Sequence, residues 1–155
     1  MSVLRKALPD YRWENVDVRA YKDEADTPYR SVTRQVLASA PDQAGELRYF
    51  EVAPGGWTTL ERHRHVHAVT ILRGRGQALV GHEVLEIGAL DFLTVPAFAW
   101  HQFRAPQGEA LGFLCMVDAS RDRPQLPTPQ QRSELEAIPE VARFLAGLGG
   151  PFPAP

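Results

Sequence analysis

Four of the five histidines of this chain lie where their side chains could meet. His63, His65 and His67 occupy alternate positions of one stretch, and His101 follows further along the chain. Side chains at alternate positions of a strand point the same way. Burying several imidazoles without a shared partner is costly, whereas neutral imidazole is a common ligand for zinc, copper, iron and nickel. The spacing therefore predicts a metal site, and His82, which falls in an expected turn, is given no role.

Strand geometry limits how many of these histidines one ion can hold. On an unbroken strand at ~3.3 Å per residue, His63 and His67 would be about 13 Å apart. That is close to the limit for two side chains that bind one ion with bonds of about 2 Å. Either the chain bulges or loops near His65, or one of the three histidines is not a ligand. A metal-free barrel, with histidines in a polar pocket, is the remaining alternative.

The composition is that of one ordinary globular domain. The chain has 155 residues, of which 44% are hydrophobic and 23% charged. A net charge of −2 gives no reason to expect nucleic acid or an anionic membrane as a partner. We find no apolar run of signal-peptide or membrane-spanning length, and the single cysteine, Cys115, suits a reducing compartment. We therefore expect a cytoplasmic protein that binds a small-molecule ligand or substrate.

Short strands separated by glycine and proline turns fill the middle of the chain. Turn signals recur at residues 54–56, 74–76, 81–82, 88, 96 and 106–108. About eight strands at such intervals indicate an all-β, jelly-roll barrel. We divide the chain into an N-terminal extension with a leading strand (1–45), a barrel core (46–118) and a C-terminal tail (119–155).

The tail is expected to be helical. Thr128 followed by Pro129 is typical of a helix start, and this helix should run to about Ile138. A second helix should begin at Pro139, with apolar residues at helical spacing. A single apolar stripe this short favours packing on the barrel.

The intervals between glycines, acids and histidines resemble those of the cupin superfamily. The first cupin motif reads glycine, five residues, histidine, one residue, histidine, three or four residues, glutamate, six residues, glycine. This chain keeps each interval, with Gly55, Glu61, His63, His67 and Gly74 at the motif positions. Two residue types are exchanged, because Glu61 stands at the first histidine position and His67 at the glutamate position.

The second cupin motif is also matched in its spacing. Its proline and histidine correspond to Pro96 and His101, while Phe98 replaces an internal glycine and Ala105 an asparagine. The strand Phe113-Leu114-Cys115 is similar to one in small manganese- or iron-binding cupins. The resemblance covers residues 46–118 and implies a cupin barrel, the double-stranded β-helix fold.

The resemblance also implies a ligand set. Glu61, His63, His67 and His101 would hold one divalent transition metal, which could be Fe, Mn, Ni, Cu or Zn. The alternative set uses His65 in place of Glu61. If His65 is not a ligand, it would contact the ligands without touching the metal.

Three further residues are candidates for the pocket wall. Phe103 shares the facing of His101, Cys115 could face the metal, and Trp57 lies just before the histidine stretch. Ordinary core packing would explain each of them as well.

The function expected from these features is that of a metal-dependent enzyme, with an oxygenase-type reaction, such as that of a mononuclear dioxygenase, on a small organic substrate. Two alternatives stay open: a binding or sensor protein with a structural metal, and a metal-dependent isomerase or lyase. A homodimer is expected because small cupins commonly pair.

Overall fold

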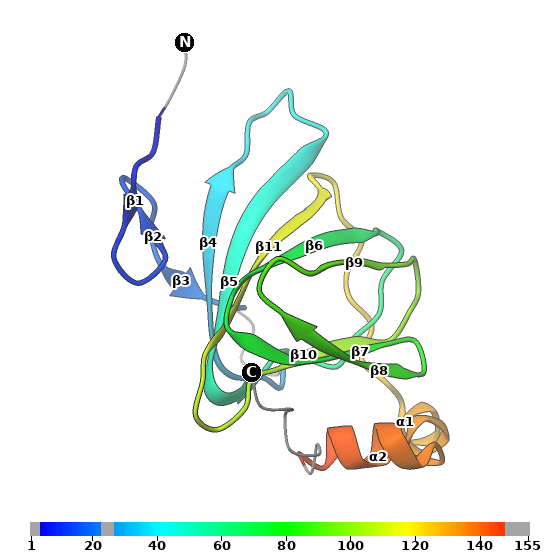
Figure 1. Ribbon diagram of the computed structural model, residues 1–155. Helices are drawn as coiled ribbons and strands as arrows, with labels where there is room; N and C mark the ends of the chain where they lie inside the picture. Colours follow the sequence, from blue (N-terminus) through cyan, green and yellow to red (C-terminus); the bar gives the residue numbers. More distant parts are fainter. Residues whose placement is uncertain (1–3, 23–26, 148–155) are drawn as a thin grey trace.

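The structure is a computed structural model that describes residues 4–22 and 27–147 (Figure 1). A separate hairpin consists of β1 (Ala7–Leu8) and β2 (Arg12–Trp13). The described strands of the main sheet are β3 (Arg19–Ala20), β4 (Arg30–Ala38), β5 (Gly45–Trp57), β6 (His67–Arg73), β7 (Arg75–Val80), β8 (Glu83–Gly88), β9 (Phe92–Val95), β10 (His101–Arg104) and β11 (Leu111–Asp118).

The main sheet is antiparallel and curled. Its strands follow the order β8-β7-β10-β5-β11-β6-β9, with β4 pairing the other side of β5 and β3 pairing β4. Figure 1 shows β7, β8 and β10 lying across from the wall that β4, β5 and β11 build. The jelly-roll fold class predicted from the sequence is confirmed.

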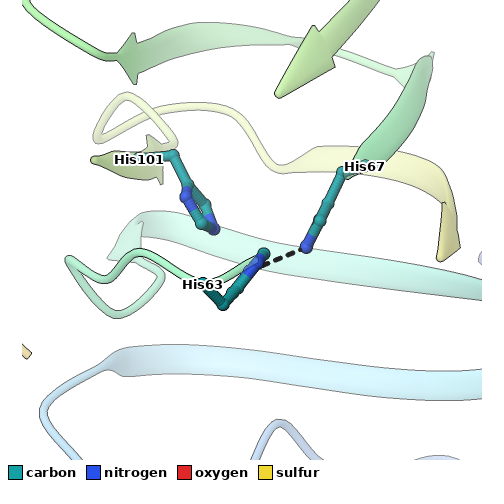
Figure 2. Close-up of side chains that lie close together, drawn as sticks. All are labelled: His63, His67 and His101. Atoms are coloured by element: carbon teal, nitrogen blue, oxygen red, sulfur yellow. Dashed lines mark hydrogen bonds between the residues drawn. The ribbon is translucent and has the colours of Figure 1, made fainter. Parts of the chain in front are cut away.

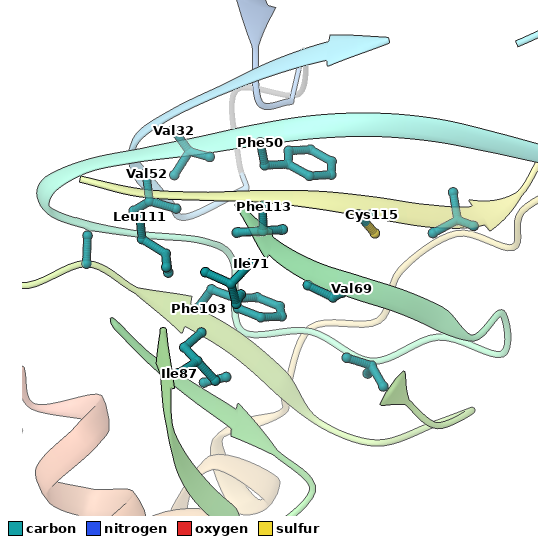
Figure 3. Packing of buried hydrophobic residues seen from close by; sticks show 14 residues of the cluster. Val32, Phe50, Val52, Val69, Ile71, Ile87, Phe103, Leu111, Phe113 and Cys115 are labelled. Carbon is teal, nitrogen blue, oxygen red and sulfur yellow. The ribbon is translucent and has the colours of Figure 1, made fainter. Parts of the chain in front are cut away.

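Alternation along β5 and β11 decides which side chains enter the barrel. Their register sets Phe113 opposite Phe50 and Cys115 opposite Arg48. Directly opposed residues of an antiparallel pair point to the same face. Phe50, Phe113 and Cys115 are all buried in the main hydrophobic cluster (Figure 3). Arg48 shares their facing, so one charged side chain joins an apolar row.

The barrel interior changes from apolar to polar along the strands. Val69 and Ile71 on β6 are fully buried in the cluster. His67 is the next residue of the same parity toward the start of β6, and Cys115 is opposite Val69 on β11. The imidazole and the thiol thus lie at the end of the hydrophobic core, where polar side chains border an apolar wall.

Two short helices cover the outside of the barrel. α1 (Pro129–Glu136) begins with a capping box in which the hydroxyl of Thr128 accepts from the amide of Gln131 at 3.2 Å. α2 (Pro139–Leu145) follows directly. Both pack through a second apolar cluster, formed by Leu60, Leu79, Trp100, Leu135, Val141, Phe144 and Leu145.

This cluster lies on the outer face of β7, because Leu79 alternates with the inward-facing Ala78. The last part of the predicted tail, residues 148–155, lies outside the described residues. Within the described ranges, none of the helices has the length and apolar character needed to cross a membrane.

Candidate metal centre

A loop over residues 58–66, between β5 and β6, carries the first candidate ligands. Glu61 pairs with His101 in an isolated antiparallel bridge, with N–O distances of 3.2 and 2.9 Å. The amide of Phe98 donates to the carbonyl of His63 at 2.7 Å. These bonds fix the loop against the segment that leads into β10, so residues about forty positions apart meet.

Phe98 has the backbone conformation that its glycine counterpart in the motif would favour. Its φ is 60°, in the left-handed region that bulky side chains rarely adopt. Its side chain is half-exposed, so the ring needs no room in the core. The turn that pins the loop is therefore kept although the glycine is not.

Three histidine side chains converge on one point (Figure 2). One nitrogen from each of His63, His67 and His101 lies within 4.8 Å of the others. The loop bends at residues 64–65, and β6 begins only at His67. This bend resolves the distance problem that an unbroken strand would pose, and it brings the rings of His63 and His67 to 4.6 Å between centroids.

Hydrogen bonds orient the rings of His63 and His101. Nδ1 of His63 donates to the carbonyl of His65 at 2.8 Å, and Nδ1 of His101 donates to the carbonyl of Ala99 at 3.0 Å. A neutral imidazole that donates through Nδ1 has an unprotonated Nε2. Both rings therefore present Nε2 as a lone-pair donor, in the orientation that metal-binding histidines commonly receive from such partners.

The ring of His67 completes the arrangement. Its Nε2 lies 2.9 Å from Nε2 of His63, and its Nδ1 lies 3.2 Å from Sγ of Cys115. Because Nε2 of His63 is an acceptor, without an ion His67 must donate to it from Nε2 and accept the Cys115 thiol proton at Nδ1. A metal ion at this point would take the place of the shared proton, and Nδ1 of His67 would then donate to the sulfur. The donor set fits a transition metal.

The electrostatics keep these imidazoles neutral. Burial lowers the pKa of His63 to about 4, with the neighbouring His101 and His65 adding to the effect. Burial likewise lowers the pKa of His101 to about 4. The pKa of His67 is also lowered, first by burial and then by the other rings. Neutral imidazole is the form that binds metal, so the site is ready for a cation at neutral pH.

Glu61 and His65, the two alternatives for completing the ligand set, both have other partners. The Glu61 carboxylate is buried and forms an ion pair with Lys22. His65 is buried, donates from Nδ1 to Asp122 at 2.8 Å and stacks on His63 at 3.5 Å between ring centroids. The structure thus brings three of the four predicted ligands together, sets Glu61 beside them in the bridge to His101, and puts His65 behind His63.

A cavity of about 190 Å³ opens beside the three histidines. Phe103 and Cys115, two of the predicted pocket residues, line it. Trp57 does not line this cavity. It is the partner of Arg104 at the other end of β10 from His101, and the Arg104 guanidinium lies 5.8 Å from the centre of its ring.

Several cavity residues were not singled out from the sequence. Lys22 and Asp122 come from segments before and after the barrel, where no pattern marks them. Three more of them are arginines: Arg34, Arg48 and Arg121. The sequence does contain a signal for Arg48. It lies two and four residues before Phe50 and Val52 on one strand, so it shares their apolar face.

Burial and nearby cations have opposite effects on the pKa of the Cys115 thiol. Burial raises its pKa to about 11, while Arg48 and Arg121 act in the lowering direction. Cys115 is therefore a protonated thiol in the resting barrel, with two cations near its sulfur.

Comparison with known proteins identifies the family. The sequence of residues 48–117 matches the family model of the cupin domain. A protein of Rhodospirillum rubrum, named 1-methylthio-D-xylulose 5-phosphate methylsulfurylase, is 59% identical over 140 residues, which make up 90% of each chain. These matches agree with the resemblance seen in the two sequence motifs.

Solved structures agree. A cupin-2 domain from Rhodospirillum rubrum superposes with a TM-score of 0.86 at 57% identity, over 94% of this chain and 98% of that one. A cupin 2 conserved barrel domain protein from Rhodopseudomonas palustris also gives 0.86, at 49% identity over 92% and 98% of the two chains. The chain therefore belongs to the cupin superfamily.

Proposed function

We propose that this cupin is a metal-dependent enzyme that removes the methylthio group from a methylthio ketose phosphate. The observation that carries the proposal is the thiol of Cys115, 3.2 Å from a histidine of the candidate metal centre, inside the cavity. The Rhodospirillum rubrum relative, whose name describes a methylsulfurylase of 1-methylthio-D-xylulose 5-phosphate, supports the choice of substrate.

His63, His67 and His101 would hold the metal ion. When bound, the ion supplies Lewis-acid stabilisation of negative charge on an oxygen of the substrate. The three histidines would hold the ion at the edge of the cavity, where substrate could reach it, and Phe103 and Phe113 give that cavity an apolar wall. The wall excludes water from the carbon that carries the methylthio group and strengthens electrostatic interactions there.

Cys115 is the group that would receive the methylthio sulfur. In this step the S–H bond of Cys115 and the bond between C1 and sulfur in the substrate break, while an S–S bond and a C1–H bond form. The electron pair of the C1–S bond stays on C1, which is reduced, while the two sulfurs are oxidised to a disulfide, so no dioxygen is needed. A second, external thiol then reduces the methyl disulfide and restores Cys115.

This proposal is closer to the isomerase or lyase alternative than to the oxygenase predicted from the sequence motifs. The oxygenase-type reaction stays a prediction, and the same assay tests it. A binding or sensor protein with a structural metal would neither remove the methylthio group nor consume dioxygen.

The test is to incubate the purified protein with 1-methylthio-D-xylulose 5-phosphate and an added thiol. NMR follows the methylthio signal while an electrode follows dioxygen. We expect loss of the C1 methylthio group with no oxygen uptake. Oxygen consumed in step with substrate would favour the oxygenase, and an unchanged substrate would overturn the proposal.

The role of Cys115 has its own readout. Cys115→Ser should keep its metal and fold but lose at least about a thousandfold in turnover, because the hydroxyl cannot form the disulfide. Without the external thiol, mass spectrometry of the wild-type protein should find one methylthio group on Cys115. A Cys115→Ser variant with full activity would contradict this role.

A further inference from the structure

The cavity beside the candidate metal centre is richer in cations than the chain as a whole. Its lining has four basic side chains, and two of its acids are already engaged: Glu61 with Lys22, and Asp122 with His65. The other basic side chains of the lining are those of Arg48 and Arg121, and Arg34 lines the cavity beside them. The whole chain carries a formal charge of −2, so this concentration of guanidinium groups is local.

Strand register explains why the arginines gather here. Arg34 on β4 is opposite Phe50 on β5, and Arg48 is two residues from Phe50 on the same face. Both therefore enter the barrel beside the row that contains Cys115. Arg121 lies three residues after the end of β11 and lines the same cavity.

The surroundings of Arg48 give the strongest indication that an anion binds here. It is 8% exposed, and within the described parts of the chain its Nε makes no hydrogen bond. A buried guanidinium nitrogen that makes no hydrogen bond is costly unless an anion accepts from it. The ring of Phe50, 5.1 Å away, covers one side of it, which leaves its donors for groups in its plane.

One carboxylate is shared between two of these arginines. Oε1 of Glu46 lies 3.5 Å from Nε of Arg48 and 3.3 Å from Nη2 of Arg121. Each guanidinium has five N–H donors, so one oxygen can engage only a few of them. Glu46 keeps the two cations near each other, and these two guanidiniums with one carboxylate still have an excess of positive charge.

We propose that Arg48 and Arg121, which line the cavity together with Arg34, form a phosphate subsite that binds the phosphate monoester of a sugar whose reacting end lies at the candidate metal centre. Planar guanidiniums match phosphate oxygens in paired hydrogen bonds, and arginine is favoured where such recognition matters. This subsite rests on the proposed function for the identity of the sugar, but its anion chemistry follows from the arginines themselves.

Calorimetric titration of the full-length protein with inorganic phosphate tests the subsite without catalysis. Arg48→Gln and Arg121→Gln should each weaken phosphate binding about ten- to hundredfold, as expected for loss of hydrogen bonds to a charged group. Arg132→Gln, on the exposed face of α1, is the matched control and should bind as the wild type does. His101→Ala should retain phosphate binding, which separates the subsite from the candidate metal centre.

The Arg121→Gln variant is expected to fold even if Arg48→Gln does not, because the Arg121 side chain is 27% exposed. Circular dichroism confirms the fold of each variant. No binding of millimolar phosphate to the wild type, or binding that survives both cavity variants, would overturn the subsite.

Failure of the subsite and failure of the proposed function give different results. Turnover of the methylthio sugar phosphate with an unchanged KM in both variants would overturn the subsite alone. Arginine-dependent phosphate binding in a protein that leaves the methylthio sugar intact would overturn the proposed function alone.

Discussion

Each of the three converging imidazoles has one nitrogen occupied and the other directed at a common point. His63 and His101 use Nδ1 to donate to backbone carbonyls, and His67 uses Nδ1 to contact Cys115. The backbone and the thiol thus fix which nitrogen faces the ion. At the residue scale, metal binding should depend on these rings and be insensitive to a histidine elsewhere.

The first prediction concerns His101. Replacing it with alanine should reduce bound metal to a small fraction of one equivalent, because only two of the three converging nitrogens remain. Elemental analysis of the purified variant measures this. His82→Ala, in the turn between β7 and β8, should retain the wild-type content, and equal metal in both variants would show that His101 is not a ligand.

The second prediction separates Glu61 from His65. If Glu61 completes the predicted ligand set on metal binding, Glu61→Gln should lower metal affinity more than His65→Gln. His65 acts through stacking on His63 and its bond to Asp122, and loss of such a supporting partner typically costs about ten- to hundredfold in affinity. Competition with a fluorescent chelator gives both affinities. A larger loss for His65→Gln would replace Glu61 with His65 in the set.

At the scale of elements, glycines of the first motif hold the turns that set the strand register. Gly74, between β6 and β7, has a φ of 68°. A Cβ on it would lie 2.0 Å from the carbonyl oxygen of Ala110. Both the backbone conformation and the space at this turn exclude a side chain.

Gly74→Ala should therefore destabilise the protein by more than about 1 kcal/mol, through backbone strain and the clash together. Gly81→Ala is the matched control, since Gly81 has a φ of 64° and its Cβ would meet nothing within 4 Å. Urea unfolding of both variants isolates the contribution of the clash. Equal destabilisation would mean that Ala110 moves away at no cost.

Sequence patterns predicted most of the barrel strands and both helices, because these have a local signal, but they did not predict the two-residue strands β1, β2 and β3. Alternation marked β5, and Thr128 followed by Pro129 marked the start of α1. The bend at residues 64–65 was foreseen only as one of two options, since the decision depends on bridges to residues far away, such as that between Glu61 and His101. Lys22 and Asp122 could not be found from the sequence, because their roles come from tertiary contacts alone.

For the whole molecule, buried neutral histidines make stability depend on pH. The pKa values of His63 and His101 fall from 6.5 to about 4 on folding. Between these values the unfolded chain binds more protons than the folded one, so stability is lost as the pH falls from about 6.5 toward 4. Urea midpoints of the metal-free protein at pH 7.5 and 5 measure this.

The control for the pH effect is a variant with both histidines replaced by glutamine, whose stability should change less over the same range. An identical pH dependence in that variant would assign the effect to other groups.

We also propose that the protein is a homodimer. The edge strand β9 carries Phe92, which is 65% exposed, and the preceding Leu90 is 82% exposed. Apolar side chains at an open sheet edge are common at subunit interfaces. Light scattering after size exclusion should give twice the chain mass, and Phe92→Lys should shift it toward the monomer.

A bound metal ion is central to both the candidate metal centre and the proposed function. Elemental analysis of the wild-type protein, purified without chelators, should find close to one equivalent of Fe, Mn, Ni, Cu or Zn per chain. The His63→Ala variant, prepared in parallel, should contain little. A wild-type protein that contains no transition metal, and takes none up when the ions are supplied, would contradict the metal centre and the function built on it.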